Sequence, residues 1–354
     1  MRALVTGASG FVGSALCRAL ARAGHTVTAL SRDPARAGAR ITASAELEVR
    51  CVPGSIADPS SIADAAEGAH VIFHAAGIAE LDAPERVLRW VHVAGTENVL
   101  RAARFAHVRR VVHISCADVS LTHEDRMHWD EKRQLSTLPV GQHARSKLMS
   151  EELALAQSDD TLEVVALRPA LLWGPDDVDG VSRLVRNVRS GLFTLYGGGR
   201  NIVATTHIDN LVAAALLAAV APQAAGRPYY ITDGEFLEAR EFYTRLFSAL
   251  GLAPLMLQGS LGYALAKARL RDLVRQHHGA TRAIVLQAAK SALFDVSRAT
   301  FDLGYEAKLD LDARMNETGD WVRAQGGLER VLLRARARSV DADVDAQVAA
   351  AGGD

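Results

Sequence analysis

The chain has 354 residues, 49% of them hydrophobic, and its acidic and basic residues nearly balance at a net charge of −1. Such a chain can bury a substantial core in one large domain or two ordinary ones. Its balanced charge lacks the excess of basic residues that is typical of nucleic-acid binding. No apolar run approaches the roughly 20 residues that cross a bilayer, and three scattered cysteines (Cys17, Cys51 and Cys116) form neither a disulfide framework nor a zinc pattern, as expected in a reducing cytoplasm.

The first elements along the chain are a strand, a glycine-rich turn and a helix. Residues 3–5 predict a buried strand, so close to Met1 that we expect no signal peptide, and the apolar spacing of 14–20 predicts a helix. Between them, Gly7 permits a tight turn, Gly10 lets the backbone approach a pyrophosphate, and Gly13 lets the helix pack close to the strand. The N–H groups at the start of the helix then face the phosphates. This context favours dinucleotide binding over a plain turn.

Strands and helices continue to alternate in the N-terminal half. The expected strands are 26–30, 48–52, 70–74, 111–115 and 164–167, and the most clearly periodic helices are 83–106 and 144–157. Alternation of this kind predicts an α/β fold with a doubly wound parallel sheet, covered by helices on both faces. We therefore expect a dinucleotide-binding domain over 1–175, whose sheet is completed by later segments around 202–232.

Beyond Pro169 the pattern changes to longer helical segments with short strands between them. We expect helices over 181–190, 208–220, 238–250, 260–276, 280–289 and 311–324. They predict a smaller, mostly helical lobe over 176–333, folded over the carboxyl ends of the strands, where ligands of such sheets bind. The tail 334–354 alternates Arg and Ala, turns acidic and ends in Ala and Gly, which predicts a frayed helix followed by disorder.

Several motifs together resemble the extended short-chain dehydrogenase/reductase family over nearly the whole chain. They are Thr6-Gly7-Ala8-Ser9-Gly10-Phe11-Val12-Gly13, His74-Ala75-Ala76-Gly77, Gly95-Thr96-Glu97-Asn98-Val99-Leu100, Leu167-Arg168-Pro169, Trp173-Gly174-Pro175 and His207-Ile208-Asp209-Asn210-Leu211. Tyr229-Tyr230-Ile231-Thr232-Asp233-Gly234-Glu235 and Leu303-Gly304-Tyr305 look like the branch of 3β-hydroxysteroid and sterol-4-carboxylate dehydrogenases. The resemblance implies a nicotinamide cofactor in the N-terminal domain, a substrate pocket roofed by the C-terminal lobe, and a homodimer formed through the helices 83–106 and 144–157.

The resemblance also identifies the positions that would contact the cofactor. In chain order these are Gly7, Ser9, Gly10, Phe11, Val12, Gly13, Arg32, Ser55, Ile56, Ala75, Ala76, Gly77, Lys147, Pro169 and Leu172. Where the family usually has an acid near the adenine, within Gly-Asp-Leu, this chain has the hydroxyl of Ser55.

The end of the second strand, Ser31-Arg32-Asp33, bears on the choice of cofactor. A guanidinium matches the geometry of a 2′-phosphate and keeps its charge, so Arg32 favours NADP(H). The alternative is that Arg32 is a solvated surface residue and that Asp33 holds the ribose hydroxyls of NAD.

The catalytic positions depart from the family pattern. The family reduces carbonyl groups with a Tyr-x-x-x-Lys pair and a Ser or Thr after the fifth strand. Lys147 is in place, but His143 stands where the tyrosine would be, and Cys116 takes the hydroxyl position, with Ser115 one residue away. The asparagine of the family's Asn-Val-x-Gly-Thr is His92. Three polar positions have thus changed together, and we take Lys147, His143 and Cys116 as the catalytic candidates.

Histidine can exchange protons near neutral pH, but its surroundings decide in which direction. Lys147 and an oxidised nicotinamide would both lower the pKa of His143, because positive neighbours disfavour the imidazolium. A neutral imidazole accepts a proton from an alcohol more readily than it donates one to a ketone. If His143 is catalytic, we therefore expect alcohol oxidation to be favoured over carbonyl reduction.

Other interpretations of the same residues stay open. His143 and the weakly donating thiol of Cys116 could fill a site that no longer turns over, in a protein that binds NADP(H) as a sensor or partner subunit. A nucleophile–base pair of Cys116 and His143 is a more remote alternative, because no orienting residue or oxyanion hole is identifiable. We expect no metal site, because no ligand spacing recurs.

The C-terminal lobe suggests the character of the substrate. Small and aliphatic residues, with Trp173, Phe193, Tyr196 and Tyr263 as bulky candidates, would suit an apolar or ring-shaped alcohol, although they would serve equally as core. The segment 255–274 is apolar on one face and carries Lys267, Arg269 and Arg271 on another, so it either caps the pocket or lies on a membrane surface. We expect an NADP(H)-dependent oxidoreductase acting on a secondary alcohol or ketone, possibly sterol-like in shape, with NAD as the second choice of cofactor.

Overall fold

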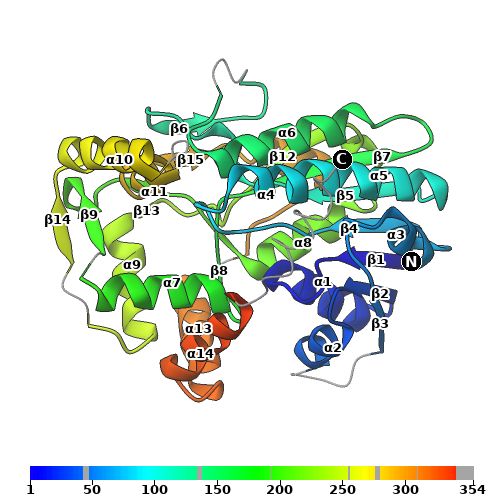
Figure 1. Ribbon diagram of the computed structural model, residues 1–354, viewed down its shortest axis with the longest axis horizontal. Helices are drawn as coiled ribbons and strands as arrows, with labels where there is room; N and C mark the ends of the chain where they lie inside the picture. The colour runs from blue at the N-terminus through cyan, green and yellow to red at the C-terminus, as the bar shows by residue number, and fades with distance from the viewer. Residues whose placement is uncertain are drawn as a thin grey trace.

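The computed structural model describes residues 1–42, 48–133, 138–191, 193–253, 256–275, 280–308 and 310–339. Its centre is a seven-stranded parallel sheet in the order β12-β7-β5-β4-β1-β2-β3 (Figure 1). The expected strands are all present in it, with ends that differ by one or two residues. The strands of the sheet are β1 (Arg2–Thr6), β2 (Thr26–Ser31), β3 (Val49–Pro53), β4 (Val71–His74), β5 (Arg110–Ile114), β7 (Glu163–Pro169) and β12 (Arg227–Ile231).

The central strands alternate their side chains between two hydrophobic cores, one on each face of the sheet. In β1, Ala3 and Val5 join one core, whereas Leu4 joins the other. Because successive side chains point to opposite faces, a strand that is buried on both faces has a continuous apolar sequence. The predicted doubly wound fold is therefore confirmed. One face is covered by α1 (Phe11–Arg22), α2 (Pro34–Thr42) and α8 (Ile208–Ala218), and the other by α3 (Pro59–Ala66), α5 (Gly95–Phe105) and α6 (Gln142–Ala156).

The helix expected over 83–106 is present, but its winding changes in the middle. It starts as α4 (Glu85–Arg89), passes through a π-helical turn at Trp90–Ala94, and continues as α5. The residues at both junctions keep right-handed helical backbone angles, so the three pieces form one continuous rod. Turns of this kind are uncommon and often mark functional positions. Here the turn contains His92.

The rest of the chain forms short strand pairs and a helical part. Short strands were expected here, but their bounds were not, because two or three residues show no periodicity. β8 (Leu171–Trp173) pairs with β11 (Thr205–His207). The other pairs are β9 (Thr194–Tyr196) with β14 (Leu257–Gly259), β10 (Ile202–Val203) with β13 (Leu237–Glu238), and β6 (Arg126–Trp129) with β15 (Ala292–Phe294). The helices are α7 (Val178–Arg189), α9 (Ala239–Ala249), α10 (Leu261–Arg275), α11 (Ala280–Ala289), α12 (Ser297–Leu303), α13 (Leu311–Ala324) and α14 (Leu328–Ser339).

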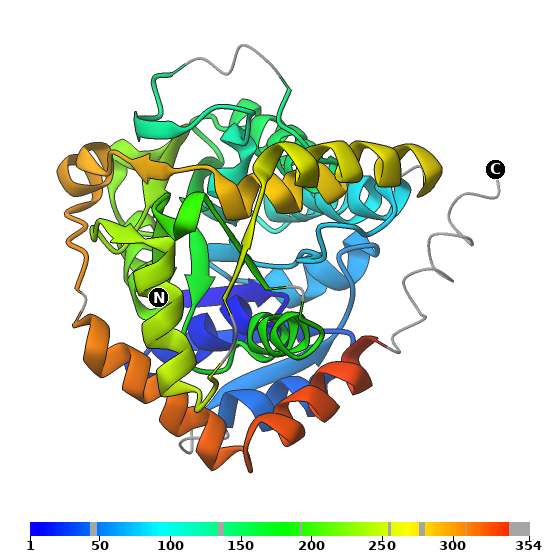
Figure 2. The ribbon, with the colours of Figure 1, turned by 90° about the vertical axis from the view of Figure 1, so that its left-hand side faces the viewer.

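The helices of the C-terminal part gather in two places. α7, α9, α13 and α14 share one hydrophobic core. In Figure 2, α10 and its neighbour α11 cross the top of the molecule, far from α13 and α14 at the bottom. Among the described residues, no helix is both long enough and apolar enough to cross a membrane. The start of the expected tail is helical as far as Ser339 in α14, and the remainder, 340–354, lies outside the described residues.

A buried carboxylate joins the end of β12 to β8, β11 and α8. Asp233, just after β12, accepts hydrogen bonds from Trp173 Nε1 (2.9 Å), the His207 backbone N–H (2.6 Å), and the side chains of Thr205 and Asn210. Nearby, exposed Asp209 at the start of α8 pairs with Arg314 of α13 at 2.8 Å, so it links these two helices. These contacts fix β8 and β11 beside the carboxyl ends of β7 and β12.

Candidate active site

The glycine-rich turn after β1 has the geometry of a phosphate cradle. Gly7 has φ +69°, and a Cβ there would lie 2.7 Å from backbone atoms of Ala76. A Cβ on Gly13 would overlap the carbonyl oxygen of Gly7, and the Gly10 N–H donates to that same oxygen at 2.9 Å. Gly7 and Gly13 therefore require glycine, a Cβ on Gly10 would lie 3.1 Å from the Gly7 carbonyl oxygen, and the turn leads directly into the N-terminus of α1 at Phe11. These features fit the pyrophosphate of a dinucleotide.

The turn from β2 into α2 places the residues that bear on the choice of cofactor. Arg32 is exposed, whereas the carboxylate of Asp33 accepts the Arg36 backbone N–H at 2.9 Å and so caps α2. Along α2, Arg40 donates to the carbonyl oxygens of Ser9 (3.2 Å) and Asp176 (2.6 Å). Arg40 thus ties α2 to the glycine turn. Arg40 was not among the residues predicted from the sequence, although the spacing of Arg32, Arg36 and Arg40 by four residues is typical of one basic helix face.

The other predicted cofactor positions lie at the carboxyl ends of the strands. Ser55 and Ile56 follow β3, and Asn98 of α5 donates to the Ile56 carbonyl at 2.9 Å. Ala75, Ala76 and Gly77 follow β4, Pro169 ends β7, and Leu172 lies in β8. A Cβ on Gly77 would be 3.5 Å from Lys147 Nζ, so the structure brings the segment after β4 next to α6.

The inward face of α6 carries a stripe of polar side chains, which are buried except for the half-buried Lys147. The residues of the stripe are His143, Ser146, Lys147, Ser150 and Glu151, spaced three or four apart, which places them on one face of the helix. Lys147 Nζ donates to the Ile114 carbonyl at 2.9 Å, and Ser150 contacts His113 Nε2 at 3.1 Å. Glu151 forms a buried ion pair with Arg168 of β7. Each member of the stripe has a partner, so the stripe fixes how α6 lies against the sheet.

His143 is held in one tautomer by a backbone carbonyl. Its Nε2–H donates to the Ile78 carbonyl at 3.0 Å, whereas its Nδ1 is buried and has no partner among the described residues. Because the carbonyl can only accept, Nε2 carries the proton and Nδ1 presents a lone pair. Burial, followed by the positive charge of Lys147, lowers the pKa of His143 to about 4. The imidazole is therefore neutral at neutral pH.

His92 binds the backbone N–H of Ile78, the residue whose carbonyl binds His143. Ser146 Oγ donates to the His143 carbonyl (2.8 Å), so it accepts from His92 Nδ1–H, also at 2.8 Å. His92 Nε2 then accepts the Ile78 N–H at 3.1 Å. The two imidazoles meet edge to face with centroids 5.3 Å apart. His92, noted in the sequence only as a departure from the family, positions Ile78 and through it His143.

Cys116 and Ser115 follow β5 beside this stripe. Burial raises the pKa of the Cys116 thiol to about 12, so the sulfur is protonated and not a thiolate. This argues against the remote interpretation of Cys116 as an activated nucleophile. Ser115 Oγ is buried and has no partner among the described residues. Ser115 Oγ and His143 Nδ1 are thus two buried polar atoms beside α6 without a partner in the described part of the chain, and such atoms call for an explanation.

Two more buried histidines stand beside Lys147. His74 lies between the hydroxyls of Thr6 (2.8 Å) and Thr96 (3.0 Å), and its ring centroid is 5.3 Å from that of His113. Burial and then Lys147 lower the pKa of His74 to about 3. Burial also lowers the pKa of His92 and of His113 well below the ordinary value. Within the described part of the chain, no group of His, Cys, Asp and Glu could hold a metal ion.

The bulky residues expected in the pocket are mostly placed elsewhere. Trp173 is buried against Phe242, and Phe193 packs on Tyr243 and Phe247, so both serve as core. Tyr263 is exposed on α10, which corrects its assignment to the pocket. Tyr196 is half-buried.

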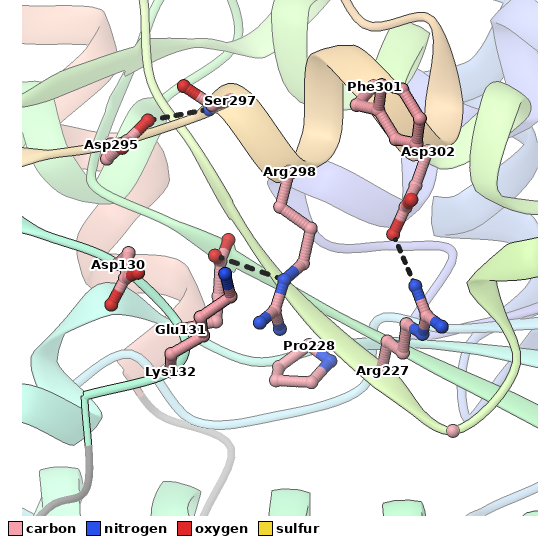
Figure 3. Close-up of a pocket in the computed structure, with 11 residues that line it drawn as sticks. Asp130, Glu131, Lys132, Arg227, Pro228, Asp295, Ser297, Arg298, Phe301 and Asp302 are labelled. Carbon is pink, nitrogen blue, oxygen red and sulfur yellow. Dashed lines mark hydrogen bonds and ion pairs between the residues drawn. The ribbon is translucent and has the colours of Figure 1, made fainter.

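A separate hollow of about 720 Å³ lies along the outer edge of the sheet (Figure 3). Its charged side chains face one another in pairs, with Arg227 3.0 Å from Asp302 and Arg298 3.6 Å from Glu131. None of the predicted site residues lines it. The candidate site therefore remains at the carboxyl ends of the strands.

The four buried histidines predict that the folded state is sensitive to acid. Their pKa values are below the unfolded value of about 6.5, so the unfolded chain binds more protons as the pH falls through 6.5. Above that pH these groups do not lower the free energy of unfolding. Below it, each histidine lowers the free energy of unfolding by about 1 kcal/mol per pH unit. Urea unfolding near pH 7.5 and 5.5 should show this loss, and His113→Leu should make it smaller. Equal midpoints at both pH values, or an unchanged slope in the variant, would contradict the assignment.

Comparisons with known proteins agree with this geometry. Residues 4–257 match the 3-beta hydroxysteroid dehydrogenase/isomerase family. A 2-alkyl-3-oxoalkanoate reductase from Stenotrophomonas maltophilia is 37% identical over 263 residues, 71% of this chain and 76% of that protein. A 4-hydroxy-2-methyl-3-oxo-4-farnesyl-3,4-dihydroquinoline-1-oxide ketoreductase from Stigmatella aurantiaca is 32% identical over 321 residues, 90% of this chain and 91% of that protein.

A solved structure supports the same assignment. DesIV, a dTDP-glucose 4,6-dehydratase from Streptomyces venezuelae with NAD and TYD bound, superimposes with a TM-score of 0.71 at 27% identity, covering 94% of this chain and all of that one. The family match spans well over half of the chain, and the glycine turn fits a nicotinamide dinucleotide. The chain therefore belongs to the 3-beta hydroxysteroid dehydrogenase/isomerase family, within the extended short-chain dehydrogenase/reductase oxidoreductases.

Proposed function

We propose that this protein is an NADP(H)-dependent oxidoreductase that acts on the secondary alcohol of an apolar molecule, sterol-like or alkyl in character, and works better as a dehydrogenase than as a ketone reductase. The observation that carries the proposal is the tautomer of His143, which keeps its proton on Nε2 and leaves Nδ1 as a buried lone pair. The names of the relatives support the substrate class, since an alkyl-oxoalkanoate and a farnesylated ketone each join a carbonyl to an apolar body.

The chain supplies the binding of the cofactor. The glycine turn and the start of α1 would hold the pyrophosphate, and Lys147 would hold the nicotinamide ribose. When bound, an oxidised nicotinamide accepts the hydride from the carbinol carbon of the substrate. Exposed Arg32, just before α2, supports NADP(H), because Asp33 is engaged in capping the helix. Arg40, in the last turn of α2, adds a second cation and is tied to Ser9 of the glycine turn.

The chain also takes up the substrate's hydroxyl proton. His143 Nδ1 would accept it while Nε2–H stays on the Ile78 carbonyl, whose dipole stabilises the imidazolium as it forms. Burial and Lys147 oppose that charge, so the imidazolium would release the proton to solvent and return to the neutral form before the next turnover. A neutral imidazole has no spare proton at Nδ1 for a ketone, which disfavours the reverse direction. Ser115 Oγ, with the weaker donor Cys116, would steady the substrate oxygen.

Replacing His143 tests the direction of the reaction. His143→Ala should lower the rate of alcohol oxidation by about 10²–10⁴ and leave cofactor affinity unchanged. His143→Tyr recreates the family's Tyr-x-x-x-Lys pair, and it should raise the ratio of ketone reduction to alcohol oxidation by about tenfold or more. Nicotinamide absorbance with a panel of sterols, hydroxy acids and their ketones measures both rates.

The same experiment distinguishes a cofactor-binding protein without turnover. The raised pKa of Cys116 and the lowered pKa of His143 are the observations that favour this second candidate, because they make a weak donor and a weak base. Inactive wild-type protein, with activity gained in the double variant His143→Tyr and Cys116→Ser, would refute the enzyme proposal and support the second candidate.

The cofactor preference is tested separately by binding. Isothermal titration should show tighter binding of NADPH than of NADH. Arg32→Ala should weaken the binding of NADPH by about ten- to a hundredfold and leave the binding of NADH unchanged. Arg50→Ala, which removes an exposed arginine from the neighbouring strand β3, is the matched control and should change neither. If the wild type prefers NADH, or if Arg32→Ala weakens both nucleotides equally, Arg32 does not bind a 2′-phosphate.

We also propose a cytoplasmic homodimer formed through the α4–α5 rod and α6. These helices pack against each other along one side of the sheet (Figure 1), and Phe105 at the end of α5 is exposed. Light scattering of the purified protein would report twice the mass of the chain.

A further inference from the structure

Two arginines of the N-terminal half bind one residue of the segment that leads into α7. Arg40, in the last turn of α2, donates through Nη2 to the carbonyl oxygen of Asp176 at 2.6 Å. Arg18 of α1 pairs with the carboxylate of the same residue at 2.7 Å, and it also donates to the Arg40 carbonyl at 3.2 Å. Both the backbone and the side chain of Asp176 are thus held by the helices next to the glycine turn. We call Arg18, Arg40 and Asp176 the clamp.

The clamp also binds the glycine turn. Arg40 Nη1 donates to the Ser9 carbonyl at 3.2 Å, while Nη2 of the same guanidinium binds Asp176. Because a guanidinium is planar and rigid, its two ends cannot move independently. The Ser9 carbonyl and the Gly10 N–H belong to one planar peptide, so the bond to the carbonyl also orients that N–H, which donates to Gly7. Arg40 therefore fixes a peptide of the turn where a pyrophosphate would bind.

The conformation and burial of Asp176 indicate that its place in the clamp is specific. Its φ is +72°, in the left-handed region that favours glycine. The side chain of Arg18 is 12% exposed and that of Asp176 is 30% exposed, so salt and water screen this ion pair less than one on the open surface. The N-cap of α7 is the next residue, Asp177, whose carboxylate accepts the Gly180 N–H at 2.9 Å. The charge of Asp176 therefore serves the clamp and not the helix.

Beyond Asp176 the chain enters the core of the C-terminal part. Val178, Val181 and Val185 of α7 belong to the hydrophobic core that α7 shares with α9, α13 and α14. In Figure 1, α13 and α14 lie below α7, and α1 and α2 lie to its right. The clamp therefore connects this C-terminal core to the glycine turn of the N-terminal half.

We propose that Arg40 is a positioning residue for the cofactor and that Arg18 and Asp176 hold it in place, so that the C-terminal part of the chain sets how tightly the glycine turn binds a dinucleotide. The clamp rests on the proposed function and goes beyond it, because Asp176 acts on the turn through Arg40 and not on the nucleotide itself. The pyrophosphate is common to NADPH and NADH. Loss of the ion pair therefore affects both nucleotides by the same factor, whereas loss of a residue that binds the 2′-phosphate affects NADPH alone.

Asp176→Asn tests the clamp in the full chain. Asparagine keeps the size of the side chain and tolerates the left-handed backbone, and the charge of Arg40 stays in place, so only the ion pair with Arg18 is lost. Isothermal titration should show that NADPH and NADH both bind about fivefold or more weakly, by the same factor. In the protein without nucleotide, the backbone amides of residues 7–13 should exchange faster with deuterium than in the wild type.

Two further variants make the test specific. Arg18→Gln should have the same effects as Asp176→Asn, and the double variant should have no larger ones, because each removes the same interaction. Asp312→Asn is the matched control. It breaks an ion pair of 3.0 Å with Arg245 of α9, inside the C-terminal part, and it should change neither nucleotide binding nor the exchange of residues 7–13.

Unchanged nucleotide binding in both clamp variants would overturn the proposal, whatever the exchange shows. So would a loss of NADPH binding without a loss of NADH binding, because Asp176 would then act at the 2′-phosphate. Failure of the proposed function gives a different result. A wild type that binds neither nucleotide refutes the proposed function, and the exchange of residues 7–13 in the clamp variants then decides by itself whether the clamp positions the turn.

Discussion

The buried polar stripe on the inward face of α6 is the constraint on which the site depends. Five polar side chains on one helix face cannot be buried unless each finds a partner, because an unpaired polar group costs about 1–3 kcal/mol. The partners are contributed by four separate regions of the fold, namely the segment after β4, the π-helical turn, β5 and β7. The contacts with these four regions together fix Lys147 and His143 relative to the ends of the strands, where the cofactor would lie.

The same burial that orders the site also sets its chemistry. A lysine among four buried histidines is tolerable only because the imidazoles are neutral, and Lys147 and burial together keep them so. His143 then has one protonated nitrogen, fixed on the Ile78 carbonyl, and one open nitrogen. A tyrosine in this place would have a proton to donate, and an imidazole in this tautomer has a lone pair instead. Under the proposed function, the replacement would change the favoured direction of proton transfer without removing the capacity for it.

Much of the fold could be predicted from the sequence, because the central strands are continuous apolar runs and the glycine turn has a single physical interpretation. The π-helical turn at His92 could not be predicted, since one wider turn hardly disturbs the apolar spacing of the helix. Lys147 and His143 were predicted as site residues from the family's four-residue spacing, and they stay a prediction. The role of Ile78 could not be predicted, because Ile78 acts through its backbone atoms and is 65 residues away from His143 in the sequence. Only the fold brings the two residues together. Likewise, the sequence could show that the segment of α10 is amphipathic but not which face is left exposed.

The tautomer and protonation of His143 can be measured without knowing the substrate. Nitrogen-15 NMR of histidine-labelled protein, with the resonance assigned by comparison with a His143→Gln variant, reports both directly. The account predicts a neutral ring protonated on Nε2 at neutral pH, which titrates only as the pH approaches about 4. A ring that is charged at neutral pH, or one whose proton sits on Nδ1, would contradict the claim that His143 offers a lone pair to the substrate.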